Sequence, residues 1–318
     1  MPRVGDHKLL LMMLRAAGLC FSVLVLVSAV ACRDKGRDKL DSTGASLPPV
    51  YPSNPLGNTS WNADGGPVMV VSVGSGGDTI AVVLPEATDS TIAALQGISP
   101  PISGLTFDLF GRGGRIGSSI AASPLPPVDA KQDCYSWPLA KLQSAHSNWR
   151  VGFATGHVHA IALDSIEAMT SADSAALAAS LAQMAATLPI ASDPTFRGLP
   201  FRVRSAYTFR LDSVDVVIAD VVRSVNEEAN PRLEHLLLLG ERPAGTKGKY
   251  NLGYYNRTAG AEESTQATEV LTAVQIGPTK RPAIVVNIEY DDGGKLALIE
   301  RVGPGKWRAT WRSAYTDC

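Results

Sequence analysis

The chain has 318 residues, of which 45% are hydrophobic and 19% are charged. Its 29 Lys and Arg residues nearly balance 30 Asp and Glu residues, so the composition excludes a disordered polyampholyte and a basic nucleic-acid-binding protein. The 29 Gly and 21 Pro residues together make up a larger part of the chain than the usual combined share of about 12%, which indicates many turns and a β-rich fold.

The first 31 residues have the pattern of an export signal. Arg3, Lys8 and Arg15 precede an uncharged run, 16–31, that is dominated by Leu, Val and Ala. This run is shorter than the roughly 20 apolar residues that a helix needs to span a bilayer, and it ends in small residues. We therefore expect residues 1–31 to be a cleaved signal peptide.

The sequence at 26–32, LVSAVAC, resembles the lipobox of bacterial lipoproteins, and the resemblance covers residues 1–32 only. It implies that Cys32 is acylated, so that the membrane becomes a partner of this exported chain in the bacterial cell envelope. Arg33 after this cysteine favours the outer membrane. Ala29 stands where Leu is usual, and Ala29-x-Ala31 also suits an ordinary signal peptidase, which would cut at the same bond and leave a free thiol.

Residues 32–67 are expected to form a flexible tether. The stretch after Cys32 contains five Pro, five Gly and many small polar residues without apolar periodicity, and as a coil it would reach roughly 30 Å. Removal of the signal leaves 26 basic and 29 acidic residues, a net charge of −3. This balance gives no steering toward nucleic acid.

Two cysteines remain for the folded part, because Cys20 lies in the signal and Cys32 is the acylation site. An even number of remaining cysteines in an exported chain predicts a disulfide between Cys134 and Cys318, and two separate thiols are the alternative. Without CxxC spacing these cysteines do not provide a tetrahedral metal site.

The predicted elements begin with three antiparallel pairs. Apolar runs at 68–73 and 79–84 flank a Gly-rich turn, and runs at 105–110 and 115–121 flank the GRGG sequence of 111–114. The glycines of this second turn resemble a dinucleotide fingerprint out of register, and we assign them to positive φ angles in a hairpin. Residues 149–163 predict a third hairpin that turns at Thr155-Gly156.

A single long helix follows at 171–188. Thr170 or Ser171 can cap it, leucines recur at helical spacing, and Pro189 ends it. The chain then returns to strands, predicted at 201–211, 214–225, 233–242, 249–256, 268–276, 283–290, 296–302 and 306–313.

An internal similarity links residues 236–257 with 296–313 at an offset of 57 to 59. It aligns Glu241-Arg242 with Glu300-Arg301, Tyr250 with Trp307, and Tyr254 with Trp311. A spacing of four in a strand puts both rings of a copy on one face. Two such hairpins resemble consecutive blades of a β-propeller, and a twisted meander or sandwich is the preferred alternative.

The predicted fold is therefore mainly β, with antiparallel meanders or a sandwich and one long helix, in the α+β class. We divide the body into an N-terminal β region that includes the helix, 68–197, and a C-terminal antiparallel region that contains the duplication, 198–318.

Candidate sites come from polar residues, because the sequence lacks GxSxG, HExxH, Walker and CxxC motifs. His157 and His159 would share one strand face and offer two metal ligands, or they are solvated histidines at a strand edge. In the polar segment 226–235, Glu227 and Glu228 near His235 have the residue types of acid/base chemistry, and a simple turn is the alternative.

The four repeated aromatic residues, Tyr250, Tyr254, Trp307 and Trp311, form a candidate sugar-stacking platform or part of a core. Our leading interpretation is a lipid-anchored envelope protein, a non-enzymatic binding or structural module that needs no cofactor and has a protein or glycan partner. The alternative is an exported hydrolase that uses the polar segment 226–235, with a His157/His159 metal site.

Overall fold

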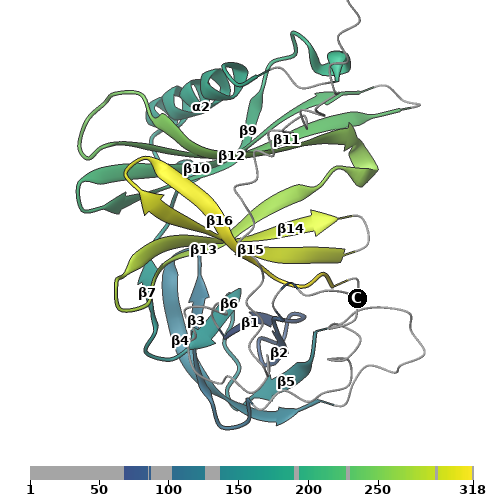
Figure 1. Ribbon diagram of the computed structural model, residues 1–318, viewed down its shortest axis with the longest axis vertical. Helices are drawn as coiled ribbons and strands as arrows, with labels where there is room; N and C mark the ends of the chain where they lie inside the picture. The colour runs from purple at the N-terminus through teal and green to yellow at the C-terminus, as the bar shows by residue number, and fades with distance from the viewer. Residues whose placement is uncertain are drawn as a thin grey trace, which may run out of the picture. The chain divides into compact units, whose positions relative to one another are not determined.

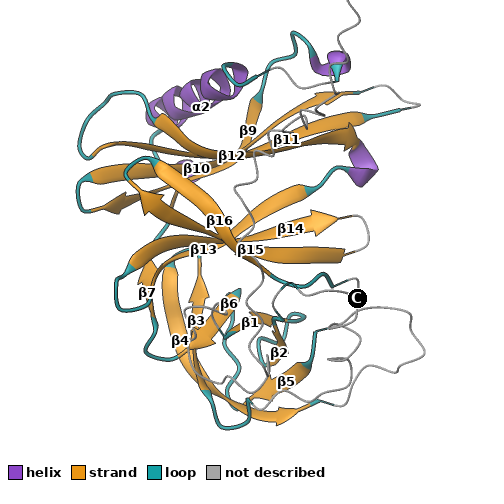
Figure 2. Cartoon of the chain, in the orientation of Figure 1, coloured by secondary structure: helices purple, strands orange, loops and turns teal. Residues whose placement is uncertain are grey.

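The computed structural model describes residues 68–84, 86, 102–125, 137–189, 193–226, 230–290 and 293–316. Within these residues the fold is mainly β, with antiparallel sheets and one α-helix (Figure 2), which confirms the predicted fold class. Cys32, Cys134 and Cys318 lie outside the described residues, as do the signal and the tether.

The first six strands close into an antiparallel barrel in the order β1-β2-β5-β4-β3-β6 (Figure 1). They are β1 Met69–Ser72, β2 Thr79–Val82, β3 Thr106–Gly111, β4 Gly114–Pro124, β5 Leu139–Leu142 and β6 Val151–Ala154. Apolar side chains such as Val70, Phe107 and Trp149 fill the interior. The hairpins predicted at 68–84 and 105–121 are confirmed as the pairs β1/β2 and β3/β4.

The third predicted hairpin is wrong in its pairing. β6 pairs with β1 and β3, whereas β7 (Val158–Ile161) pairs with β13 of another sheet. Because closure of the barrel occupies both edges of β6, no edge remains for β7. The chain therefore leaves the barrel after the turn at Thr155-Gly156.

The remaining strands form two five-stranded sheets, each a four-stranded meander with a short fifth strand at one edge. The first sheet has the order β12-β11-β10-β9-β8 and the second the order β16-β15-β14-β13-β7. Their strands are β8 Asp164–Ser165, β9 Arg202–Leu211, β10 Val214–Val225, β11 Arg232–Pro243, β12 Asn251–Ala261, β13 Ala267–Ile276, β14 Arg281–Tyr290, β15 Gly293–Gly303 and β16 Lys306–Arg312.

Both sheets are buried on both faces. One hydrophobic cluster lies between the first sheet and the helix, a second between the two sheets, and a third between the second sheet and the barrel. Successive side chains of a strand enter different clusters, so uninterrupted apolar runs such as Leu236–Leu239 are buried throughout. The region 68–197 thus contributes to the C-terminal sheets, because β7, β8 and the helix all join them.

The helix α2 spans Ser171–Ala186, two residues shorter than predicted. Thr170 caps it, and its side-chain oxygen accepts a hydrogen bond from the Asp173 N–H. Leu181 and Ala185 pack on the first sheet. Three short 3₁₀ helices accompany it, η1 Ile166–Ala168, η2 Pro194–Phe196 and η3 Glu262–Ser264.

The internal similarity corresponds to the two meanders, β9–β12 and β13–β16. Leu237 faces the second sheet and its counterpart Leu296 faces the barrel, so equivalent side chains are displaced by one layer. The copies therefore stack in the same sense, as propeller blades do, rather than face to face across a two-fold axis. The short fifth strands also occupy corresponding places in the two sheets. β8 pairs with β9 at Thr208 and β7 pairs with β13 at Ala273, and each of these residues is three positions before the end of its strand.

Candidate functional site

The four repeated aromatic residues do not share faces as their spacing predicts. Tyr250 packs on the helix side of the first sheet, whereas Tyr254 packs between the sheets. Trp307 packs between the sheets, whereas Trp311 packs toward the barrel. A β-bulge in each copy causes the difference, because one extra residue, Gly253 or Thr310, reverses the alternation of faces.

The bulge at Gly253 also brings the two meanders together. A Cβ at this position would lie 2.9 Å from Trp307 Cδ1 and 3.0 Å from the Gly305 carbonyl oxygen. The contact places β12, the edge strand of the first sheet, beside β16, the edge strand of the second.

We expect Gly253→Ala to lower the free energy of unfolding by about 1–3 kcal/mol, because the backbone carbonyl of Gly305 has to move. Gly303→Ala is the matched control, since its Cβ would meet nothing within 4 Å. Urea unfolding of both variants tests this, and equal stabilities would show that the close approach is not needed.

Glu241 is the main polar link between the meanders. Its carboxylate accepts two hydrogen bonds from Arg301, at 2.7 and 2.8 Å, one from the Gly305 N–H at 3.0 Å and one from Trp307 Nε1 at 2.7 Å. The residue is 5% exposed. Burial by itself raises the pKa of Glu241, but the hydrogen bonds from Arg301, Gly305 and Trp307 outweigh it and hold the pKa below its ordinary value.

Glu300, the counterpart of Glu241 in the second copy, lacks this support. It is also buried, but its nearest ion-pair partner, Arg281, is 3.7 Å away. Burial raises the pKa of Glu300, and the attraction of Arg281 and Arg308 offsets it only in part. The same Glu-Arg dipeptide thus occupies opposite electrostatic environments in the two copies.

A buried ionic cluster lies on the helix side of the first sheet. Glu234 is fully buried, accepts a hydrogen bond from Arg223 across the strands, and its Oε1 lies 3.1 Å from Arg257 Nε. Arg223 also stacks over Phe201 at 4.5 Å and over Phe196 at 5.6 Å. The carboxylate is thereby held between two guanidinium groups, which compensate its charge in an apolar setting.

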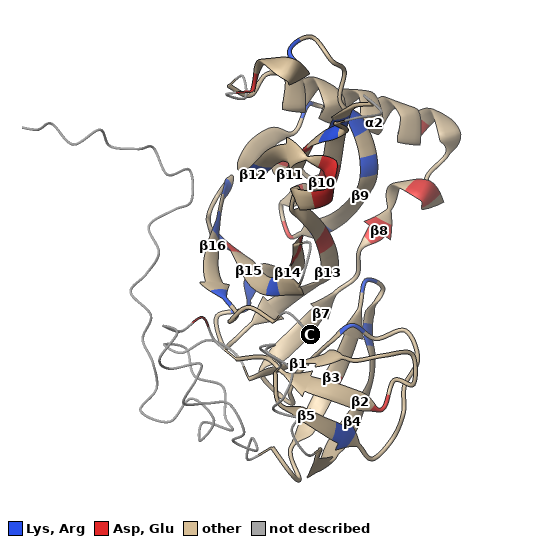
Figure 3. Cartoon of the chain, turned by 90° about the vertical axis from the view of Figure 1, so that its right-hand side faces the viewer, with Lys and Arg blue, Asp and Glu red and all other residues tan. Residues whose placement is uncertain are grey.

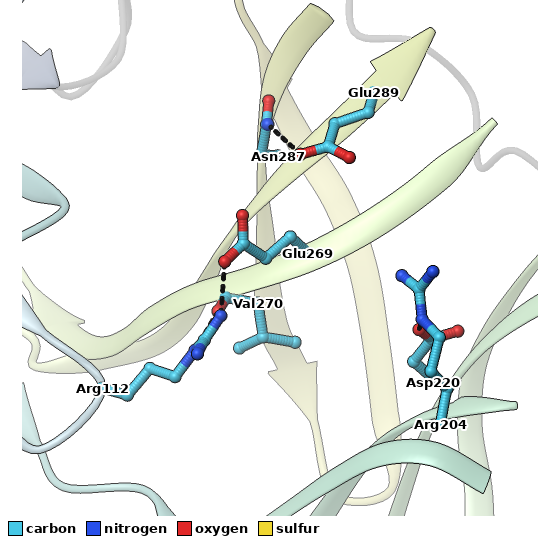
Figure 4. Close-up of polar contacts among 7 residues, drawn as sticks. All are labelled: Arg112, Arg204, Asp220, Glu269, Val270, Asn287 and Glu289. Carbon is cyan, nitrogen blue, oxygen red and sulfur yellow. Dashed lines mark hydrogen bonds and ion pairs between the residues drawn. The ribbon is translucent and has the colours of Figure 1, made fainter. Parts of the chain in front are cut away.

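His235, the histidine of the predicted polar segment, is 2% exposed and faces the second sheet rather than a loop. Its Nδ1 lies 2.9 Å from Asp220 Oδ1, and Arg204 donates a hydrogen bond of 2.5 Å to the other oxygen of Asp220 (Figure 4). Glu227 and Glu228 lie outside the described residues. Asp220 and His235 belong to neighbouring strands, so their pairing required the register of β10 and β11.

The GRGG segment forms the β3/β4 hairpin turn, as predicted, and Gly114 has a φ of 113°. Its Arg112 joins the barrel to both sheets. The guanidinium donates hydrogen bonds to the Val270 carbonyl at 2.8 Å and to Glu269 at 2.5 Å (Figure 4). It also lies 5.4 Å from the Tyr207 ring centroid. These contacts give the segment a structural role.

The predicted histidine pair lies at β7, where His157 precedes the strand and His159 is exposed on it. Among the described residues, no group of three His, Cys, Asp or Glu side chains is arranged to hold a metal ion. Within that same part of the chain, no helix has both the length and the apolar character required to cross a membrane.

A group of cations occurs along the hairpins that end in the edge strands. Residues 242–257 and 301–313 each contain four Lys or Arg and no Asp or Glu. Figure 3 shows this basic character along β16. Five of these cations form no side-chain hydrogen bond or salt bridge with any residue that the structure describes, and we call them the basic edge: Lys247, Lys249, Lys306, Arg308 and Arg312. Of these, Arg308 lies opposite Glu300 on the neighbouring strand and attracts its carboxylate.

Most other arginines of the described ranges, such as Arg210, Arg223 and Arg301, pair with carboxylates. The basic edge therefore stands out by its lack of salt bridges as well as by its charge. The net charge of the whole chain does not predict it, although the local excess of Lys and Arg is visible in the sequence.

Comparisons of this chain with protein-family models, with curated proteins and with solved structures find no match.

Proposed function

We propose that this protein is a lipid-anchored component of a bacterial cell envelope whose β-rich body is a binding module for an anionic partner. The observation that carries the binding role is the basic edge, five cations that form no hydrogen bond or salt bridge with a described residue in a chain with a net negative charge. Lys247, Lys249 and Lys306 are exposed and Arg308 and Arg312 are half-buried, and a local excess of cations of this kind favours an external anion.

The anchor is supported by the sequence at its N-terminus. The uncharged run 16–31 ends directly before Cys32, and the polar stretch 33–67 separates that cysteine from the first strand. Acyl chains bury about 0.8 kcal/mol per methylene, so two or three of them hold a protein at a membrane.

Of the candidate acid/base residues, His235 has surroundings that favour a structural role over hydrolysis. His235 lies between the two sheets at 2% exposure beside Asp220, where a substrate has no direct approach. Buried polar pairs between neighbouring strands favour one register of those strands.

Globomycin, an inhibitor of the lipoprotein signal peptidase, tests the anchor. We expect treated cells to accumulate a precursor that retains residues 1–31, and Cys32→Ser to show the same block without the drug. Intact mass of the mature protein gives the second measurement, an N-terminal residue that carries acyl chains. Normal maturation during treatment, or an unmodified thiol at the new terminus, would refute the acylation.

A further inference from the structure

We propose that the basic edge docks on the anionic headgroups of the membrane that holds the anchor, and so orients the β-rich body. The anionic partner of the proposed function is thus a phospholipid surface. The inference rests on that function for the location of the protein, whereas the chemistry of the surface stands on the described residues alone.

The charges of the basic edge are suited to lipid phosphates. Lys306, Arg308 and Arg312 occur on one seven-residue strand, β16, which carries no acidic residue. Lys247 and Lys249 lie in the exposed loop before β12, and Lys249 is the counterpart of Lys306 in the duplication. The duplication has therefore placed cations at the same position of both edge hairpins.

The two hairpins are held together as one surface. Gly253 of β12 contacts Gly305 and Trp307 of the second hairpin, and Glu241 of β11 binds Arg301 and Trp307. Because these contacts fix the hairpins relative to each other, the exposed lysines of both hairpins, Lys247, Lys249 and Lys306, are carried on one rigid unit. A rigid array loses less conformational entropy on binding than separate flexible side chains.

The half-buried aromatic residues add to the fit. Trp311 lies on β16 with three of the cations, Tyr254 lies on β12 after the loop that holds the other two, and both rings remain partly accessible. Tyr and Trp, with an apolar ring and a polar tip, are enriched at the headgroup level of membranes. Arginine and lysine beside such rings match the chemistry of an anionic interface.

Because the tether keeps the body near the membrane, a weak attraction between the basic edge and the lipid is sufficient to orient the body. A cation near an anionic leaflet strengthens partition about fivefold, so several cations give weak but measurable binding. A chain attached through roughly 35 residues has an effective concentration near the surface in about the millimolar range. The edge therefore orients a body that the lipid anchor already retains, which favours a membrane over a diffusing acidic protein.

Vesicle cosedimentation tests the proposal. The protein is the non-acylated chain of residues 33–318, which retains every residue that the structure describes. We expect binding to phosphatidylcholine vesicles that contain phosphatidylglycerol at about 30%, release at about 0.5 M salt, and little binding to pure phosphatidylcholine. Substituting Gln for Lys306, Arg308 and Arg312 together should weaken binding at least about tenfold.

The matched control removes the same charge elsewhere. Arg150, Arg197 and Lys280 are exposed and hold no ion pair with a described residue, so their triple Gln variant should bind within about threefold of wild type. Circular dichroism verifies folding, and Lys247→Gln with Lys249→Gln is the substitute if the β16 variant unfolds.

Equal loss in both triple variants, or binding that does not depend on phosphatidylglycerol, would overturn the proposal. Retention of an acidic protein or glycan by the wild-type chain without any vesicle binding would assign the basic edge to that partner instead. Because the chain tested is not acylated, these outcomes are independent of whether globomycin blocks maturation. Failure of the docking and failure of the anchor are therefore distinguishable.

Discussion

Replacing Glu234 with Gln should lower the free energy of unfolding by about 3–5 kcal/mol. Glu234 is fully buried between Arg223 and Arg257, whose side chains are 9% and 17% exposed. Loss of the carboxylate leaves two guanidinium groups with their charge uncompensated in a largely apolar region. Urea unfolding at pH 7, followed by circular dichroism, measures the change.

The control for this prediction is an exposed ion pair. Asp78 and Lys141 lie 2.8 Å apart with side chains 39% and 43% exposed, so Asp78→Asn should change stability far less than Glu234→Gln does. A Glu234→Gln variant as stable as Asp78→Asn would show that the buried cluster does not support the first sheet.

Glu241→Gln is expected to lower the stability at pH 7 by about 2–4 kcal/mol. The neutral amide accepts fewer of the four hydrogen bonds that the carboxylate receives and leaves Arg301 without its counter-charge. The meanders should then separate more readily. Thermal and urea unfolding of the variant measure the loss.

Glu300→Gln provides the comparison within the same molecule. Burial raises the pKa of Glu300, so its ionised form is disfavoured in the folded state, and the substitution should be neutral or stabilising by up to about 1 kcal/mol at pH 7. A large loss in this variant, similar to that of Glu241→Gln, would contradict the difference between the two copies.

The pH dependence should have opposite signs for the two carboxyl groups. The pKa of Glu241 is lowered on folding, so its contribution is present above the unfolded value near 4.5 and is lost as pH falls through the folded pKa. The pKa of Glu300 is raised, so stability from this group increases as pH falls through its folded pKa. Glu241→Gln should therefore flatten the acid limb of wild-type stability, and Glu300→Gln should steepen it.

At the candidate sites the sequence identifies the residue types but not the residues that they contact. The sequence contains the repeated Glu-Arg dipeptide, but it does not show that Glu241 of one copy binds Arg301 of the other. That contact exists because the meanders stack one layer apart, which sets the first Glu beside the second Arg. His235 and Glu234 likewise acquire their partners from neighbouring strands, and no local pattern in the segment 226–235 specifies them.

The sequence by itself determined the β-rich class, the first two hairpins, a helix cap at Thr170 or Ser171 and the duplication, because these depend on residues close together in the chain. Only the tertiary structure decided that β6 closes a barrel and that β7 joins another sheet, since strands compete for edges across long distances. It also decided the faces of the aromatic rings. A single bulged residue, Gly253 or Thr310, reverses every later side chain, and the apolar pattern of a strand buried on both faces carries no record of that reversal.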